Sequence, residues 1–450
     1  MPLWCLVMPI TSLLIVPSIQ GTIPAYLMAF ASLALVLPSR ENTWLESQRA
    51  RYLSIALLLA GIWLFLLCGS QLAHIISDRN NFGDLSLIRN DDRRVLLRPA
   101  LFTQTLYLAA CICTALFFRF FFREEWMRYV FWGAWFLALY GIYEWLFFLV
   151  FKEPGDFIAN RMYGDHPGSW SQTMQVGPFT LLRIKSTFGE PSWFSAAVVP
   201  YFFLALEYRR RLLAVALLFC IVFSTSTSAF AGFIFAIVLY AVLKKKISVS
   251  LVAAALLFAA AFAALYFLFP NTFHDMFVAK LRGENLSGQG RMEHAAAAAD
   301  AENTLTVLNR IFGIGFGYHY GGVYFAVLMN TGWIGMAVYS YAFLKPVFLL
   351  PADSGGIPFK VSLATLFVLF YISVSELFLP TTWMFLGLAY WRLDKRRAHL
   401  AWTLPPLPKR PEAVPKLVPT AKRPLARRNC LSNLSHTRLH GARLRSNVSR

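Results

Sequence analysis

Long apolar runs separated by short polar connections decide what this chain can fold into. The runs from Ser54 to Ile76 and from Val249 to Phe269 contain no Asp, Glu, Lys or Arg. A helix of about 20 such residues crosses the roughly 30 Å hydrocarbon core of a bilayer. Hydrophobic residues make up 57% of the 450-residue chain and charged residues only 14%, so a soluble globule has nowhere to bury this apolar surface. We therefore expect an all-α, polytopic membrane bundle.

The pattern predicts about twelve transmembrane helices. Their expected bounds are Leu3–Val16, Ile23–Leu37, Ser54–Ile76, Ala100–Phe121, Tyr129–Phe151, Phe194–Leu206, Leu212–Phe223, Ala229–Leu243, Val249–Phe269, Val323–Leu344, Val361–Val374 and Leu379–Trp391. In this arrangement the basic clusters 209–211, 244–246 and 392–397 share one side of the membrane, which the positive-inside rule assigns to the cytoplasm. Both termini are then cytoplasmic, and two large polar loops, 152–193 and 270–322, face outward.

The net charge of +19 suggests nucleic-acid binding until its location is considered. Eleven Lys or Arg residues and a single acid, Glu412, lie between Trp402 and Arg450. Most of the remaining positive charge lies in short connections between apolar runs, as membrane topology requires. We expect a membrane domain over 1–401 and a basic, Pro-rich, disordered cytoplasmic tail over 402–450, with membrane lipids and not nucleic acid as its neighbours.

The outer loops lack the motifs of cofactor-dependent enzymes. They contain no P-loop, no zinc-ligand spacing, no nucleophile elbow and no cysteine, so we expect neither a metal nor a nucleotide cofactor. The glycines of Gly313–Gly317 follow no predicted strand, so they predict a tight turn that brings His319 and Tyr320 to the membrane mouth. An outer enzyme without a cofactor needs a substrate that already carries a leaving group, such as a lipid-linked diphosphate.

The second outer loop carries the best candidates for binding such a diphosphate. Residues Met292 to Leu308 read as an Ala-rich helix, on which Arg291 and His294, three residues apart, share a face. Arginine holds diphosphate oxygens through paired hydrogen bonds and stays charged at any relevant pH. The alternative interpretation of a single loop arginine is a solvated side chain.

The first outer loop ends in Glu190 and Pro191, immediately before the predicted sixth span. Proline suits the first turn of a helix, and an acid near the helix N-terminus is stabilised by the dipole. The alternative interpretation places Glu190 at the membrane mouth as a base.

Four stretches carry a resemblance to a known family. They are STFGEPSWFSAAVVP at Ser186–Pro200, SGQGRMEHAAAA at Ser287–Ala298, NRIFGIGFGYHYGG at Asn309–Gly322 and LMNTGWIGM at Leu328–Met336. In their order and spacing they resemble the O-antigen polymerase and ligase superfamily, specifically Wzy-type polymerases of bacterial polysaccharide repeat units, over about 129–391. Ligases of this superfamily usually carry a His-Asn pair shortly before the Gly-rich helix that follows the second outer loop. This chain has Asn330 there without a preceding His, which favours a polymerase, while His319 lies earlier and leaves the distinction open.

The resemblance implies a glycosyltransferase at the outer face of the bacterial inner membrane, independent of metal and nucleotide. It would transfer a growing O-antigen or exopolysaccharide glycan from undecaprenyl diphosphate to the next lipid-linked repeat unit, alongside a flippase and a chain-length regulator of the same pathway. The expected catalytic residues are Glu190, Arg291 and His294. The expected substrate-binding residues are Arg183, Lys185, Arg161, Arg282 and His319.

Three other interpretations stay open. A ligase would share the fold and differ in its acceptor, and a structural scaffold would use the loops only as connections. A lipid-linked oligosaccharide flippase or other transporter would need charged groups inside the membrane, of which only Glu144 and Glu376 stand out.

Overall fold

Helices dominate the computed structural model of the protein, which describes residues 1–17, 19–36, 43–77, 82, 84–89, 94–161, 171–245, 249–284, 286–372 and 374–403. Residues up to Ala401 form one compact unit. The predicted disordered tail falls almost entirely outside the described residues.

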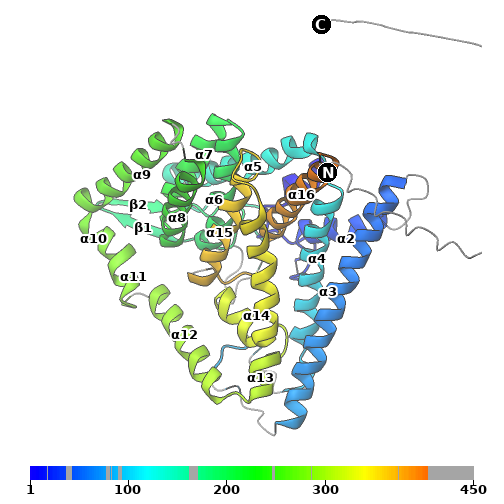
Figure 1. Ribbon diagram of the computed structural model, residues 1–450. Helices are drawn as coiled ribbons and strands as arrows, with labels where there is room; N and C mark the ends of the chain where they lie inside the picture. The colour runs from blue at the N-terminus through cyan, green and yellow to red at the C-terminus, as the bar shows by residue number, and fades with distance from the viewer. Residues whose placement is uncertain are drawn as a thin grey trace, which may run out of the picture. The chain divides into compact units, whose positions relative to one another are not determined.

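The first half of the chain contains one short and several long helices (Figure 1). They are α1 (Pro2–Val7), α2 (Pro24–Val36), α3 (Thr43–Ile76), α4 (Pro99–Phe120), a single 3-10 turn (Glu124–Trp126), α5 (Met127–Phe151), α6 (Pro191–Glu207) and α7 (Arg211–Phe223). Between α5 and α6, strands β1 (Thr173–Val176) and β2 (Phe179–Leu182) form an antiparallel hairpin with Val176 opposite Phe179. The all-α prediction did not anticipate this hairpin.

The second half continues with α8 (Thr227–Lys244) and α9 (Val249–Leu268), and a chain of shorter elements leads from them to the last three long helices. The elements are α10 (Pro270–Phe273), a π-helical turn (His274–Val278), α11 (Ala279–Leu281), α12 (Leu286–Thr304), α13 (Val307–Phe312), α14 (Val323–Leu349), α15 (Ile357–Ile372) and α16 (Pro380–Thr403). The Ala-rich helix predicted from Met292 therefore begins six residues earlier, at Leu286.

Six helices of the described chain are long and apolar enough to cross a membrane. They are Leu45–Ile76, Pro99–Phe120, Glu124–Phe151, Thr227–Lys244, Leu251–Leu268 and Val323–Leu349. Three further apolar helices are shorter, at Pro24–Ala34, Arg211–Phe223 and Ile357–Ile372. A membrane-type helical bundle is thus present, although the helices that meet this criterion are fewer than the twelve spans predicted.

The first predicted span, Leu3–Val16, is wrong as a continuous helix. The helix α1 ends at Val7, and Pro9 follows without a backbone N–H to continue it. The next residues run irregularly and are held from outside, because the backbone N–H groups of Thr11 and Ser12 both donate to the carbonyl of Thr187. Irregular backbone is tolerated in a membrane protein where other protein segments satisfy its polar groups.

The helix α6 lies at the centre of the packing. Every residue from Pro191 to Ala205 is buried, and α6 packs against α7, α8 and α15. A helix that is apolar all round and covered on all sides can bury this much surface without a polar face. Because Pro191 is its first residue and Glu190 its N-cap, the helix-start interpretation of these two residues is confirmed.

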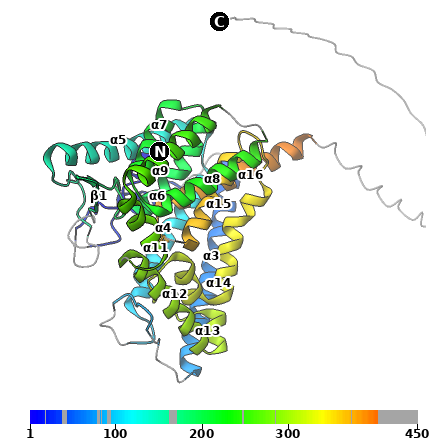
Figure 2. The same cartoon turned by 90° about the vertical axis from the view of Figure 1, so that its left-hand side faces the viewer.

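A second group of helices meets at α13. Contacts join α13 to both α3 and α14, and Figures 1 and 2 show the blue α3 and the yellow α14 side by side where α13 meets them. Gly332 interrupts α14 with φ 64°, and the freed carbonyl of Met329 accepts a hydrogen bond from Ile314 N. This break lets the Gly313–Gly317 turn pack directly against α14.

Candidate functional site

A cavity of about 900 Å³ lies between α3, α4, α14 and α16. Its walls are mainly apolar side chains, among them Leu59, Ile112, Val338 and Leu386. Polar groups gather at two places along it. The first, here named the Arg161 end, contains Arg161, His319, Tyr320, Ser375 and Glu376, and the second, the Arg119 end, contains Arg119, Tyr341, Lys345 and Asp394.

The two ends are far apart along α4. Tyr107 lines the cavity near the Arg161 end, and Arg119 lies twelve residues further along the same helix. At 1.5 Å per residue this separation is roughly 18 Å. The cavity therefore has a long apolar middle section, with ionic groups at each end.

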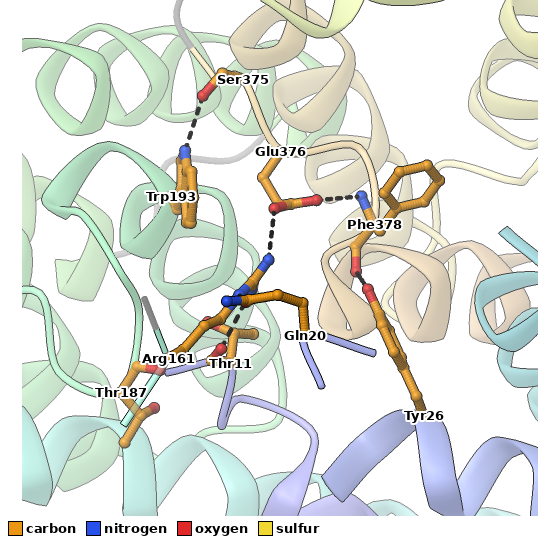
Figure 3. Close-up of polar contacts among 9 residues, drawn as sticks. All are labelled: Thr11, Gln20, Tyr26, Arg161, Thr187, Trp193, Ser375, Glu376 and Phe378. Atoms are coloured by element: carbon orange, nitrogen blue, oxygen red, sulfur yellow. Dashed lines mark hydrogen bonds and ion pairs between the residues drawn. The ribbon is translucent and has the colours of Figure 1, made fainter. Parts of the chain in front are cut away.

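Arg161 is held by three segments of the chain (Figure 3). Its Nε donates to Gln20 Oε1 at 3.1 Å, Nη1 donates to the carbonyl of Thr11 at 3.3 Å, and Nη2 donates to Glu376 Oε2 at 3.4 Å. The side chains of Arg161 and Glu376 are each 14% exposed. A partly accessible guanidinium beside an apolar cavity is suited to binding an anionic head group.

The connection from α15 to α16 positions Glu376. Phe378 N donates to Glu376 Oε1 at 3.2 Å, and the carbonyl of Phe378 accepts from Tyr26 Oη at 2.6 Å. On the other side, Trp193 Nε1 donates to Ser375 Oγ at 3.1 Å. Side chains from α2 and α6 thus hold the side chain of Ser375 and the backbone of Phe378, on either side of Glu376 (Figure 3).

His319 lies in the turn between α13 and α14 and is only 2% exposed. Its Nδ1 lies 3.0 Å from the carbonyl of Ser86, which can only accept, so Nδ1 carries the proton. Burial lowers the pKa of His319 to about 4, with the nearby His294 acting in the same direction. The ring is therefore neutral near pH 7. Its Nε2 has no hydrogen-bond partner among the described residues, and a Cβ at Gly321 would lie 2.9 Å from it.

Ser86 links the two candidate histidines. Its hydroxyl lies 3.2 Å from His294 Nδ1, while its carbonyl accepts from the backbone of Tyr320 and from the ring of His319. The buried Arg98 holds this segment, because its Nη2 donates to the carbonyls of Ile88 and Arg89 at 2.8 Å. The structure thus brings α12 and the glycine turn together through a segment that the sequence analysis did not single out.

The Arg119 end is a compact ion pair. Arg119 Nε donates to Asp394 Oδ2 at 2.8 Å and Nη2 donates to Asp394 Oδ1 at 3.4 Å. The guanidinium also lies 4.9 Å from the ring centre of Phe120 and 4.7 Å from that of Tyr390. A bidentate pair between aromatic rings has a fixed geometry, and both oxygens of Asp394 are engaged by the guanidinium of Arg119.

Lys185 is fully buried away from the cavity. Its Nζ lies 2.9 Å from Glu144 Oε1 and 2.5 Å from Asp156 Oδ2. Ser186 N donates to the second oxygen of Glu144, and Tyr140 donates to Asp156 at 2.9 Å. These contacts fasten the first large loop to α5, and they leave Lys185 no open side toward a substrate.

Arg183 is also engaged in the fold. Its Nη2 donates to the carbonyl of Thr225 at 3.2 Å, and Nη1 donates to the side chain of Gln172. Thr225 lies in the short connection between α7 and α8. Arg183 is therefore placed to hold that connection against the end of the β-hairpin.

Among the remaining predicted residues with described side chains, Glu190, His294 and Arg282 do not line the cavity. Glu190 accepts a hydrogen bond from Ser192 Oγ at 2.8 Å. Arg282 follows α11, is 66% exposed in its side chain and lies 3.8 Å from Glu284. Arg291 lies on α12, but its side chain is outside the described residues. Of the seven predicted site residues whose side chains are described, the structure brings Arg161 and His319 to the cavity.

Four charged residues at the cavity were not predicted as site residues: Glu376, Arg119, Lys345 and Asp394. A signal was available only for Glu376, which stands in an otherwise apolar run. Arg119 and Asp394 read as ordinary cytoplasmic flanking charges, and nothing in their sequence context pairs them. In the described part of the chain, no group of three His, Cys, Asp or Glu side chains is arranged to hold a metal ion.

Comparison of the chain with protein-family models, with curated proteins and with solved structures gives no match.

Proposed function

We propose that this protein is a membrane glycosyltransferase that polymerises lipid-linked polysaccharide repeat units. The observation that supports this most directly is the cavity, which places an arginine and a carboxylate at one end of a long apolar section. A polyprenyl diphosphate has the complementary form, because an anionic head group is joined to a long hydrocarbon tail. The four sequence stretches that resemble Wzy-type polymerases support the same class of substrate.

In this proposal the tail lies along the apolar section between α3, α4 and α14. Leu58, on the cavity wall, is 61% exposed, as expected for a wall that borders lipid. The diphosphate then lies at Arg161, whose guanidinium would stabilise the negative charge that develops on the leaving group. Undecaprenyl diphosphate is the carrier that the resemblance implies.

The proposed topology places the Arg161 end at the periplasmic face and the Arg119 end at the cytoplasmic face of the bacterial inner membrane. The basic residues that line the cavity at the second of these ends are Arg119 and Lys345. Lys395, which follows Asp394 and forms an ion pair with Glu124, adds a third basic residue there. An excess of Lys and Arg is typical of cytoplasmic connections. The six long and three shorter apolar helices supply nine of the about twelve crossings proposed, and two periplasmic loops at 152–193 and 270–322 complete this arrangement.

The proposed reaction joins the acceptor sugar to the donor glycan. A hydroxyl oxygen of the acceptor attacks the anomeric carbon of the donor, a new carbon–oxygen bond forms, and the bond to the diphosphate breaks. The diphosphate leaves with the bonding electron pair, and a base takes the hydroxyl proton. The flippase and the chain-length regulator of the same pathway are the proposed partners.

The test is the glycan size distribution on a gel, in cells that lack this gene and carry either the wild type or a variant. We expect single repeat units in the null cells, a long ladder with the wild type, and loss of the ladder with Arg161→Ala. Arg123→Ala, which removes a 58% exposed arginine that does not line the cavity, is the matched control and should keep the ladder. Long polymer accumulating on the lipid carrier in the null cells would instead identify a ligase. Unpolymerised repeat units held on the cytoplasmic side would identify a flippase.

A further inference from the structure

Among the described residues, two carboxylates line the cavity: Glu376 and Asp394. Asp394 is bound through both oxygens to Arg119, at the end roughly 18 Å from the Arg161 end along α4. Glu376 lies at the Arg161 end, beside the guanidinium proposed to bind the diphosphate. A base for the transfer must lie within hydrogen-bond reach of the acceptor hydroxyl, so position favours Glu376.

The contacts of Glu376 leave it capable of accepting a proton. Each of its oxygens receives one long hydrogen bond, at 3.4 Å from Arg161 and at 3.2 Å from Phe378 N. A carboxylate has about four lone-pair positions, so acceptor capacity is left on both oxygens. The anchored backbone at Ser375 and Phe378 holds the carboxylate in place without using that capacity.

The other candidate bases are less well placed. Glu190 accepts a bond from Ser192 Oγ and does not line the cavity, and His294 is turned to Ser86. His319 does line the cavity, but its Nδ1 carries the proton and its Nε2 is covered, with an accessible area below 1 Å². Burial also makes the His319 ring a weak base.

We propose that Glu376 is the catalytic base of the transfer and that its ion pair with Arg161 is the resting state of the site. The inference rests on the proposed function. When the acceptor hydroxyl oxygen bonds to the anomeric carbon, Glu376 takes the hydroxyl proton, and the diphosphate departs with the electron pair of the broken bond. The protonated Glu376 later releases its proton to water.

The ion pair has a consequence for binding that does not depend on turnover. A diphosphate at Arg161 competes with Glu376 for the same guanidinium and is repelled by its carboxylate. Replacing Glu376 by Gln should therefore tighten the binding of a polyprenyl diphosphate by roughly two- to fivefold, the range of a partly exposed ion pair. Replacing Arg161 by Ala should weaken it instead.

The experiment uses the purified full-length protein in lipid nanodiscs with two readouts. The first is the binding of farnesyl diphosphate, and the second is polymer formation from a polyprenyl-diphosphate-linked repeat unit. We expect Glu376→Gln to bind the probe roughly two- to fivefold more tightly than the wild type. We expect it to lose turnover by about 10²- to 10⁴-fold, as expected for removal of a general base. Glu376→Asp should recover part of the turnover, and Glu125→Gln, the matched control at a 64% exposed carboxylate that does not line the cavity, should stay within threefold of the wild type.

Two outcomes would overturn the role of Glu376. Turnover of Glu376→Gln within threefold of the wild type would exclude it as the base. Loss of probe binding together with turnover would show that Glu376 only positions Arg161. Failure of the proposed function gives a different result, which is seen in the wild type alone. The wild type would then bind the probe but form no polymer, and Glu376 could not be the base of that reaction.

Discussion

At the scale of single residues, Lys185 shows most clearly how charge is buried in this protein. One fully buried ammonium group faces two carboxylates, of which Glu144 is fully buried and Asp156 is 4% exposed. Removing one partner of a buried ion pair leaves an uncompensated charge, which costs about 3–5 kcal/mol. We predict that Lys185→Met lowers the free energy of unfolding by about this amount. The melting temperature of the purified protein in detergent should therefore fall markedly.

The matched control for Lys185→Met is Arg282→Met, which changes an exposed side chain and should leave the melting temperature unchanged. The triple variant that also carries Glu144→Leu and Asp156→Leu removes the two carboxylates as well. It should recover part of the free energy of unfolding that Lys185→Met loses. If the melting temperature of Lys185→Met equals that of the wild type, the three side chains do not form a buried ion cluster.

The sequence could predict which residue types the site needs, but not which side chains face each other. Arg161, Arg183 and Lys185 are equivalent as basic residues of one polar loop, yet Arg161 reaches the cavity while the other two hold the fold together. Their partners, Glu376, Thr225 and Glu144, lie 41 to 215 residues away along the chain. Only tertiary packing decides these pairings. The roles of Arg161 and His319 in substrate binding stay predictions.

At the scale of elements, the interruption of α14 at Gly332 is the feature most sensitive to a single atom. Its φ of 64° lies in the left-handed region, and a Cβ there would lie 2.3 Å from the carbonyl oxygen of Ile311. We predict that Gly332→Ala destabilises the protein by more than about 1 kcal/mol, because it adds backbone strain to a clash with α13. Displacing α13 should also shift the His319 turn and reduce polymer formation.

Gly61→Ala on α3 is the control for this prediction. A Cβ at Gly61 would meet nothing within 4 Å, and alanine is favoured over glycine inside a helix by about 1 kcal/mol. Its melting temperature should equal or exceed that of the wild type, while that of Gly332→Ala should fall. Equal melting curves for Gly332→Ala and the wild type would show that α14 does not need glycine at its break.

Element positions were largely predictable, since each predicted segment from the second onward coincides with a helix. The predicted Tyr129–Phe151 and Leu212–Phe223, for example, correspond to α5 at Met127–Phe151 and α7 at Arg211–Phe223. The prediction of the first segment was wrong because apolar composition does not distinguish a membrane helix from an irregular stretch of chain that is buried against neighbouring segments. Thr187, 176 residues away, supplies the acceptor that makes the irregular form possible.

At the scale of the whole membrane unit, four helices from distant parts of the chain enclose the apolar section of the cavity. No single apolar run predicts this cavity, because the cavity depends on how α3, α4, α14 and α16 are arranged relative to one another. The ion pairs at the two ends of the cavity differ in their hydrogen bonds. Arg119 is locked to Asp394 through two hydrogen bonds, whereas Arg161 keeps a single long bond to Glu376. An anionic ligand can open the weaker pair more easily, which favours the Arg161 end for the proposed head group.

If the apolar section holds a lipid tail, then filling it should impair binding without disturbing either ionic end. Val338 lies on the α14 wall of the cavity, and Val338→Trp adds an aromatic ring to that space. We predict about tenfold weaker binding of farnesyl diphosphate, equivalent to roughly 1.4 kcal/mol, and shorter glycan ladders. Val242→Trp on α8, a 67% exposed position away from the cavity, is the matched control and should leave both unchanged.

Since inorganic diphosphate has no tail, its binding should be the same in Val338→Trp and in the wild type. Equal weakening for inorganic diphosphate would show that the tryptophan acts by distorting the Arg161 end, and unchanged farnesyl diphosphate binding would show that the tail lies elsewhere.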